Sequence, residues 1–120
     1  MGEPARGQQE GRGDGSTAAM EYLAHGQAAA EALGGVDIVI VNASAMSGKG
    51  REAWENSFNV DLMSLVGFIE AATPHLEKSS AASVVTISTT SAIEAGPITT
   101  ANSYGALKAA VLQHSSAQAR

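Results

Sequence analysis

Two short runs of β-branched residues stand out from a chain whose other apolar positions follow helical spacing. The first run spans residues 36–41 and the second spans 83–88. Nearly continuous hydrophobicity over so few residues, without alternation, is typical of strands that are buried on both faces of a parallel sheet. The pattern therefore predicts one strand in each run.

Helical spacing precedes the first run. A helix is expected from Ser16 or Thr17 to about Leu33, where Gly34-Gly35 provides a stop signal. Its loose apolar stripe consists of Met20, Leu23, Ala24, Ala28 and Leu33. We expect this stripe to face the core.

Two further helices follow the strands. Apolar residues recur every three or four positions between about Glu52 and Leu76, at Trp54, Phe58, Leu62, Leu65, Ile69 and Ala72. A third helix is expected from Ser103 to about Ala117. The order helix–strand–helix–strand–helix predicts an α/β fold with parallel strands and right-handed crossovers.

Composition and net charge exclude several classes of protein for this chain. A length of 120 residues with 44% hydrophobic residues fits one globular domain, with a glycine-rich, flexible tail over residues 1–16 and the folded part over 17–120. The net charge of −5, without a cluster of basic residues, disfavours nucleic-acid binding. No apolar run is long enough to span a membrane, and no secretion signal is recognised, so a soluble, cytoplasmic protein is expected.

Polar residues follow both predicted strands, where ligands bind in open parallel sheets. Asn42-Ala43-Ser44 ends the first strand, and a run of hydroxyl residues from Ser88 to Ser91 ends the second. In the third helix Tyr104 and Lys108 are four positions apart and therefore lie on one face. An ammonium group stabilises a phenolate, so such a pair suits general acid/base chemistry. The three histidines are far apart and indicate no metal site.

Four motifs in this order resemble the short-chain dehydrogenase/reductase family. They are Val39-Ile40-Val41-Asn42-Ala43-Ser44, the stretch from Trp54 to Leu62, Val84-Val85-Thr86-Ile87-Ser88-Thr89, and the stretch from Tyr104 to Val111. The resemblance covers residues 17–120. It implies a Rossmann-type parallel sheet flanked by helices in three α/β/α layers.

The resemblance also implies roles for single residues. Tyr104 would be the catalytic acid/base, and Lys108 would favour its ionised form and hold the nicotinamide ribose. The family's catalytic serine lies thirteen positions before the tyrosine, which selects Ser91, whereas alignment on the strand end selects Thr89. Ser91 is slightly favoured, and both residues carry a hydroxyl group.

Two other family positions have counterparts in this chain. Asn42, Ala43 and Ser44 match part of the family's Asn-Asn-Ala-Gly strand end, which shapes the adenosine side of the cofactor cleft. The family's helix-start asparagine corresponds to Asp61, in Phe58-Asn59-Val60-Asp61-Leu62. In the family that residue mainly contributes a main-chain carbonyl to a proton relay, a role that can survive the change to aspartate.

The resemblance implies an oxidoreductase that uses NAD or NADP to interconvert a small-molecule carbonyl and alcohol, and a homo-oligomer in the full-length family. The glycine-rich pyrophosphate loop, Thr-Gly-x-x-x-Gly-x-Gly, is not found in the 41 residues before Asn42, nor is the family's next strand found after the third helix. We therefore expect a partial, incomplete Rossmann domain. The alternative is a catalytically inactive fragment that acts as an interaction or structural module.

Overall fold

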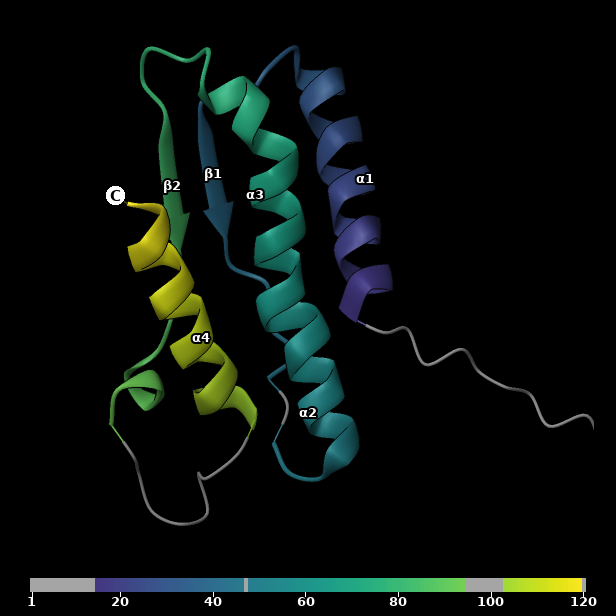
Figure 1. The fold of residues 1–120 in the computed structure, drawn as a ribbon, viewed down its shortest axis with the longest axis vertical. Coiled ribbons are helices and arrows are strands. Elements are labelled where there is room, and N and C mark those ends of the chain that lie inside the picture. The colour runs from purple at the N-terminus through teal and green to yellow at the C-terminus, as the bar shows by residue number, and fades with distance from the viewer. Residues whose placement is uncertain (1–14, 47, 95–102, 120) are drawn as a thin grey trace, which may run out of the picture.

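The structure, a computed structural model, describes residues 15–46, 48–94 and 103–119. Its elements follow the predicted order (Figure 1): α1 (Gly15–Leu33), β1 (Ile38–Val41), α2 (Arg51–Ser57), the π-helical turn η1 (Phe58–Leu62), α3 (Met63–Leu76), β2 (Ser83–Thr86), the 3-10 turn η2 (Thr90–Ala92) and α4 (Ser103–Gln118). Both strands are shorter than predicted. Most of the predicted tail, residues 1–14, lies outside the described residues, and its last two residues belong to α1. Across the described ranges no helix is long and apolar enough to cross a membrane.

The two strands pair in parallel, as predicted. Ile38 lies opposite Ser83 and Val41 lies opposite Thr86. The ladder continues past the strand ends, because the Ile87 N–H donates to the Val41 carbonyl over 3.0 Å. Both strands therefore end at the same edge, where their following loops meet.

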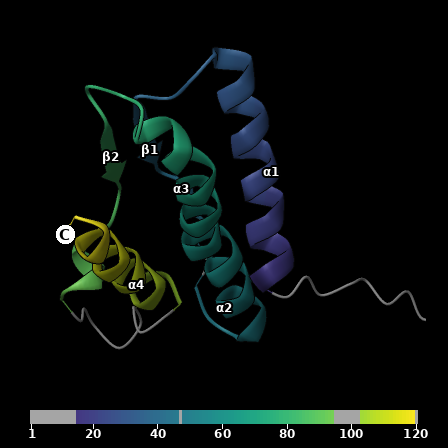
Figure 2. The same cartoon turned by 45° about the horizontal axis from the view of Figure 1, so that its top comes forward.

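Helices α3 and α4 cover one face of this sheet, and α1 packs beside α3 (Figures 1 and 2). Val41 points toward them and forms a buried cluster with Leu65 of α3 and Val111 of α4. The alternate strand positions form what we call the open face, which consists of Ile38, Ile40, Val85 and Ile87, all exposed. The second helical layer of a three-layer domain is not among the described residues.

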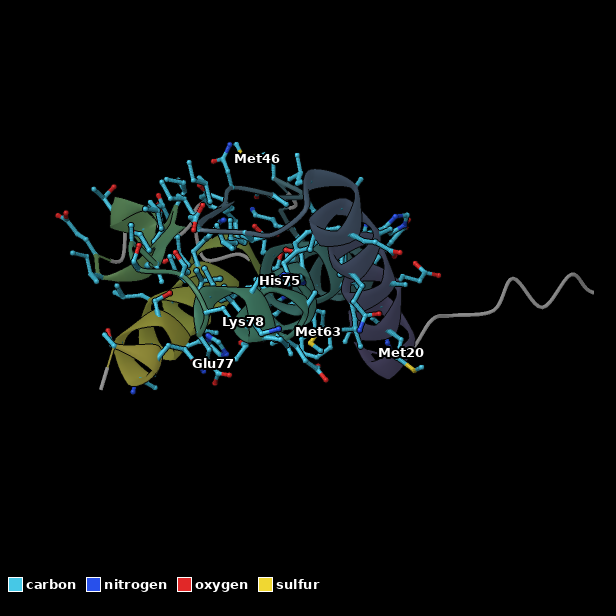
Figure 3. The ribbon with its side chains drawn as sticks, turned by 90° about the horizontal axis from the view of Figure 1, so that it is seen from above. Met20, Met46, Met63, His75, Glu77 and Lys78 are labelled. Atoms are coloured by element: carbon cyan, nitrogen blue, oxygen red, sulfur yellow. The ribbon has the colours of Figure 1, made fainter. Side chains whose placement is uncertain are left out.

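Helix α1 packs against α3 through small residues. A Cβ atom on Gly67 of α3 would come within 2.6 Å of the Ala19 carbonyl oxygen, and one on Gly26 of α1 would come within 2.7 Å of the Ala71 Cβ atom. The expected stripe on this helix is wrong at four of its five positions. Met20 and Leu33 are 69% and 78% exposed, Ala24 and Ala28 are exposed as well, and only Leu23 is half-buried. Figure 3 shows Met20 at the outer surface. Two backbones this close leave no room for large side chains between them.

The predicted second helix is one continuous helical path with a π turn inside it. A π turn closes over one more residue than an α turn, which rotates the preceding residues relative to the following ones. Leu65 and Ala72, after the turn, are buried, whereas Trp54 and Phe58 are 46% and 39% exposed. The single apolar stripe predicted for 52–76 therefore holds only after the turn.

Candidate functional site

The loops that follow β1 and β2 meet the first turns of α4. The Ser103 N–H, at the start of α4, donates to the Gly48 carbonyl over 3.1 Å, and its hydroxyl donates to the same oxygen over 3.2 Å. The Ser57 hydroxyl of α2 donates to the Ser103 hydroxyl over 2.8 Å. Sequence reasoning missed this buried serine pair, since two isolated serines carry no signal in the sequence.

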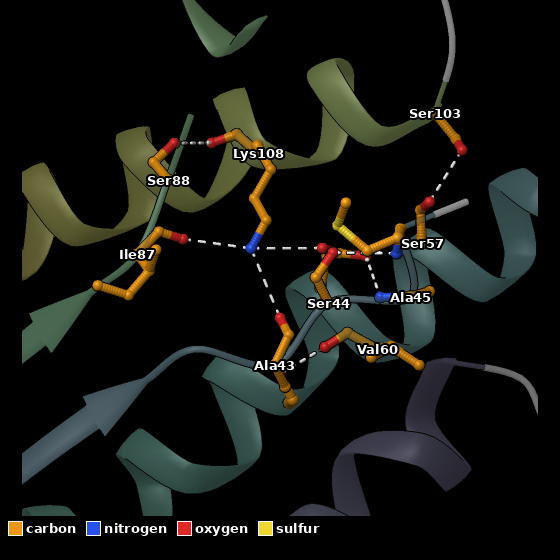
Figure 4. Close-up of polar contacts among 12 residues, drawn as sticks. Ala43, Ser44, Ala45, Ser57, Val60, Ile87, Ser88, Ser103 and Lys108 are labelled. Carbon is orange, nitrogen blue, oxygen red and sulfur yellow. Dashed lines mark hydrogen bonds and ion pairs between the residues drawn. The ribbon is translucent and has the colours of Figure 1, made fainter. Parts of the chain in front are cut away.

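Lys108 of α4 lies at the centre of these contacts (Figure 4). The residue is 3% exposed. Its Nζ donates to the Ile87 carbonyl over 3.2 Å and to the Ala43 carbonyl over 3.5 Å. The Ser88 hydroxyl also donates to the Lys108 carbonyl over 3.1 Å. The lysine thus joins the carboxyl ends of both strands to α4.

Asp61 provides the acidic partner of this lysine. Its Oδ1 atom lies 3.3 Å from Lys108 Nζ, and both side chains are almost completely buried. Its Oδ2 atom accepts a hydrogen bond from the Ala45 N–H over 3.2 Å. The sequence indicated a main-chain role for Asp61, and the structure adds this carboxylate contact. The π turn η1 is the element that carries the side chain into the site.

Tyr104 lies one turn before Lys108 on α4 and is half-buried. The two candidate hydroxyl residues lie nearby, in and before η2. The Thr89 hydroxyl caps this turn by accepting from the Ser91 N–H over 3.3 Å. A Cβ atom on Gly105 would come within 2.9 Å of the Ser91 carbonyl oxygen, so Ser91 packs against the residue that follows Tyr104. The structure therefore gathers all five predicted catalytic residues at one end of the sheet.

The β1 strand end offers polar groups beside this cluster. Asn42 is exposed, and the Ser44 hydroxyl accepts from the Met46 N–H over 3.1 Å. Met46 has a φ of 50°, a left-handed conformation that non-glycine residues rarely adopt. An exposed amide and a hydroxyl can hydrogen-bond the polar groups of a dinucleotide, so the chemistry of this strand end fits the adenosine side of the cleft, which the resemblance assigns to it. Residues 15–46 contain no glycine-rich loop for the pyrophosphate of the dinucleotide.

The chain is similar in sequence to known dehydrogenases. A family model described as short chain dehydrogenase matches residues 15–120. The isoepoxydon dehydrogenases of Penicillium expansum and Aspergillus clavatus are 45% and 43% identical to this chain over 89 residues. Each alignment covers 73% of this chain and 34% of the relative. The chain thus spans about a third of the length of these curated relatives.

The fold agrees with a solved structure of the same kind. The chain matches an active-site complex of RhlG with NADP from Pseudomonas aeruginosa, with a TM-score of 0.71 and 26% identity. The match covers 85% of this chain and 43% of that protein. The parallel strands, the flanking helices and the matched family model agree with one another. The chain therefore belongs to the short chain dehydrogenase family.

Proposed function

We propose that this chain carries the acid/base site of an NAD- or NADP-dependent oxidoreductase that interconverts a carbonyl and an alcohol. The observation that supports this most is the position of Lys108. Its buried ammonium lies between the ends of two parallel strands, one helical turn from Tyr104. Parallel sheets bind their ligands at this edge.

Tyr104 would exchange a proton with the substrate oxygen. A phenol has one acidic proton and, when ionised, one basic oxygen, so the same group can serve both directions of the reaction. Lys108 would favour the ionised phenol electrostatically and bind ribose hydroxyls. A nicotinamide, when bound, supplies the hydride chemistry.

Ser91 is the better candidate for the hydroxyl that orients the substrate oxygen. The Thr89 hydroxyl already accepts the hydrogen bond that caps η2. Ser91 is exposed and packs beside Gly105, next to the catalytic tyrosine in sequence. Thr89 would then hold the turn that carries Ser91, through its hydrogen bond with the Ser91 N–H.

Asn42, Ala43 and Ser44 would line the cofactor cleft at the end of β1. The Ala43 carbonyl accepts from Lys108, so its position is fixed relative to the catalytic helix. The substrate would be a small-molecule alcohol or carbonyl. Isoepoxydon is a specific candidate, because the two curated relatives are named for it.

The test is a pair of tyrosine variants of the full chain, assayed for binding of NADH and NADPH by fluorescence and for turnover of isoepoxydon with NAD or NADP. Tyr104→Phe removes the phenolic hydroxyl and keeps the ring. We expect cofactor binding within about twofold of the wild type and a loss of turnover of at least about 100-fold, the usual contribution of general acid/base catalysis.

Tyr22→Phe is the matched control, because Tyr22 is the other tyrosine of the chain and lies in α1. Its turnover should stay near the wild-type value. Equal turnover in Tyr104→Phe and wild type would contradict the assigned role. A wild-type chain that binds neither cofactor would favour the alternative, an inactive member of the family that acts through interactions.

A further inference from the structure

The side chain of Asp61 uses both of its carboxylate oxygens inside the molecule. Oδ1 faces Lys108 Nζ at 3.3 Å, and Oδ2 accepts from the Ala45 N–H at 3.2 Å. Asp61 is 1% exposed. This one residue therefore links the π turn, the loop after β1 and the catalytic helix.

The Lys108 ammonium has three partners, two by hydrogen bonds and one by an ion pair, and they differ in charge. Two are the neutral carbonyls of Ile87 and Ala43, and the third is the carboxylate of Asp61. A buried ammonium is costly unless an opposite charge and hydrogen bonds replace its water. Among the described residues Asp61 is the one joined to Lys108 by an ion pair. The two carbonyls orient the ammonium, and the carboxylate compensates its charge.

We propose that Asp61 is a positioning residue that acts through its side-chain carboxylate and holds the Lys108 ammonium at the edge of the sheet. This differs from the main-chain role expected from the sequence. The inference rests on the proposed function in one respect, which is that Lys108 binds the cofactor beside Tyr104. The ion pair between Asp61 and Lys108 can be tested without any cofactor.

The first experiment observes lysine ammonium groups by ¹⁵N NMR in the full chain at mildly acidic pH. Of the three lysines, Lys49 and Lys78 are exposed, and their ammonium protons exchange with water too fast to detect. Lys108 is buried and should give one protected signal, which Lys108→Met identifies by its loss. A through-space correlation to the Asp61 side chain is expected. A wild-type Lys108 without a protected signal would overturn the proposal.

Variants at position 61 separate charge from shape. Asp61→Asn keeps the size and should lose the protected signal, whereas Asp61→Glu keeps the charge and should retain it. Ser64→Ala is the matched control, since Ser64 is also buried in this helical path but bonds to the Val60 carbonyl of its own helix. An unchanged signal in a folded Asp61→Asn protein overturns the proposal. If that variant does not fold, the wild-type correlation and Asp61→Glu decide the question.

The second experiment measures the dissociation constant for NADH by nicotinamide fluorescence. Asp61→Asn should weaken binding by about tenfold, because the ammonium loses the ion pair that holds it; a tenfold change corresponds to about 1.4 kcal/mol. Ser64→Ala should stay within about twofold. Equal binding by wild type and folded Asp61→Asn would overturn the positioning role. If the wild type does not bind NADH, the proposed function fails, and the ammonium signal alone supports or overturns the ion-pair role of Asp61.

Discussion

At the scale of single residues, the negative charge of Asp61 also affects Tyr22 of α1. Tyr22 of α1 packs its ring edge-on against Phe68, with 5.3 Å between the ring centroids. Burial raises the pKa of Tyr22 above its ordinary value of 10.0, and the negative charges of Glu21 and Asp61 raise it further. All three effects disfavour the phenolate, so the neutral phenol is the form that fits the folded state.

This raised pKa predicts a loss of stability at alkaline pH. The contribution of Tyr22 to the free energy of unfolding is fully present below its pKa in the unfolded chain, about 10. It is lost as the pH rises through the higher pKa that Tyr22 has in the folded chain. In the Tyr104→Phe variant, the tyrosinate absorbance should rise above pH 10.0 for the folded chain and near 10.0 in urea. Tyr22→Phe should remove this alkaline loss of unfolding free energy. Titration of folded Tyr22 at or below 10.0 would show that the predicted environment is wrong.

The sequence predicted those site residues whose relation is local or follows from strand ends. Tyr104 and Lys108 lie one turn apart on a helix, and this spacing is visible in the sequence. The Ser57–Ser103 bond joins residues 46 positions apart, and only the folded chain brings them together. The Asp61–Lys108 contact depends likewise on a π turn that no local pattern specified. The sequence named Asp61 as a candidate residue, but it did not predict the contact of its carboxylate with Lys108.

At the scale of elements, the contact between α1 and α3 depends on a missing side chain. A Cβ atom on Gly67 would lie 2.6 Å from the Ala19 carbonyl oxygen, 2.7 Å from the Tyr22 Cβ and 2.9 Å from the Leu23 nitrogen. Two of these atoms belong to the backbone of α1, which cannot yield by changing a rotamer. The helices must therefore move apart to accept even one methyl group.

Gly67→Ala should accordingly destabilise the chain by about 1–3 kcal/mol, as overpacking does elsewhere, despite the better helix propensity of alanine. The measurement is the free energy of unfolding in urea. Gly48→Ala serves as the control, because a Cβ atom there meets nothing within 4 Å. A Gly67→Ala chain that is as stable as the wild type would show that α1 and α3 do not approach this closely.

Helix and strand order could be predicted because the apolar periods differ so clearly along the chain. Helix faces were harder to predict. In α1 the large residues Met20 and Leu33 are exposed and Ala30 is 1% exposed, because close backbone packing favours small residues over hydrophobic ones. Small size alone does not locate the α3-facing side of α1 either, since Ala24 and Ala28 are exposed as well.

At the scale of the whole molecule, the open face is the largest departure from an ordinary soluble domain. Ile38 and Ile40 are 62% and 65% exposed, and Val85 and Ile87 are 42% and 43% exposed. Ile38, Ile40 and Val85 lie on the two hydrogen-bonded strands, and Ile87 follows β2 where its N–H continues the ladder, so the four residues form one apolar surface. No described part of the chain covers it. Exposed apolar faces on sheets with unpaired edges favour association.

We therefore expect the 120-residue chain to self-associate with increasing concentration, as followed by sedimentation velocity. Ile40→Thr combined with Val85→Thr keeps β propensity while reducing apolar area, and should weaken association by at least about tenfold, since about 1.4 kcal/mol suffices for that factor. Ile93→Thr is the control, because Ile93 is 78% exposed but lies outside both strands. A concentration-independent monomer, or equal effects of the open-face and control variants, would refute this prediction. A positive result would identify the open face, rather than the edge of the sheet beside Lys108, as the surface through which the chain associates.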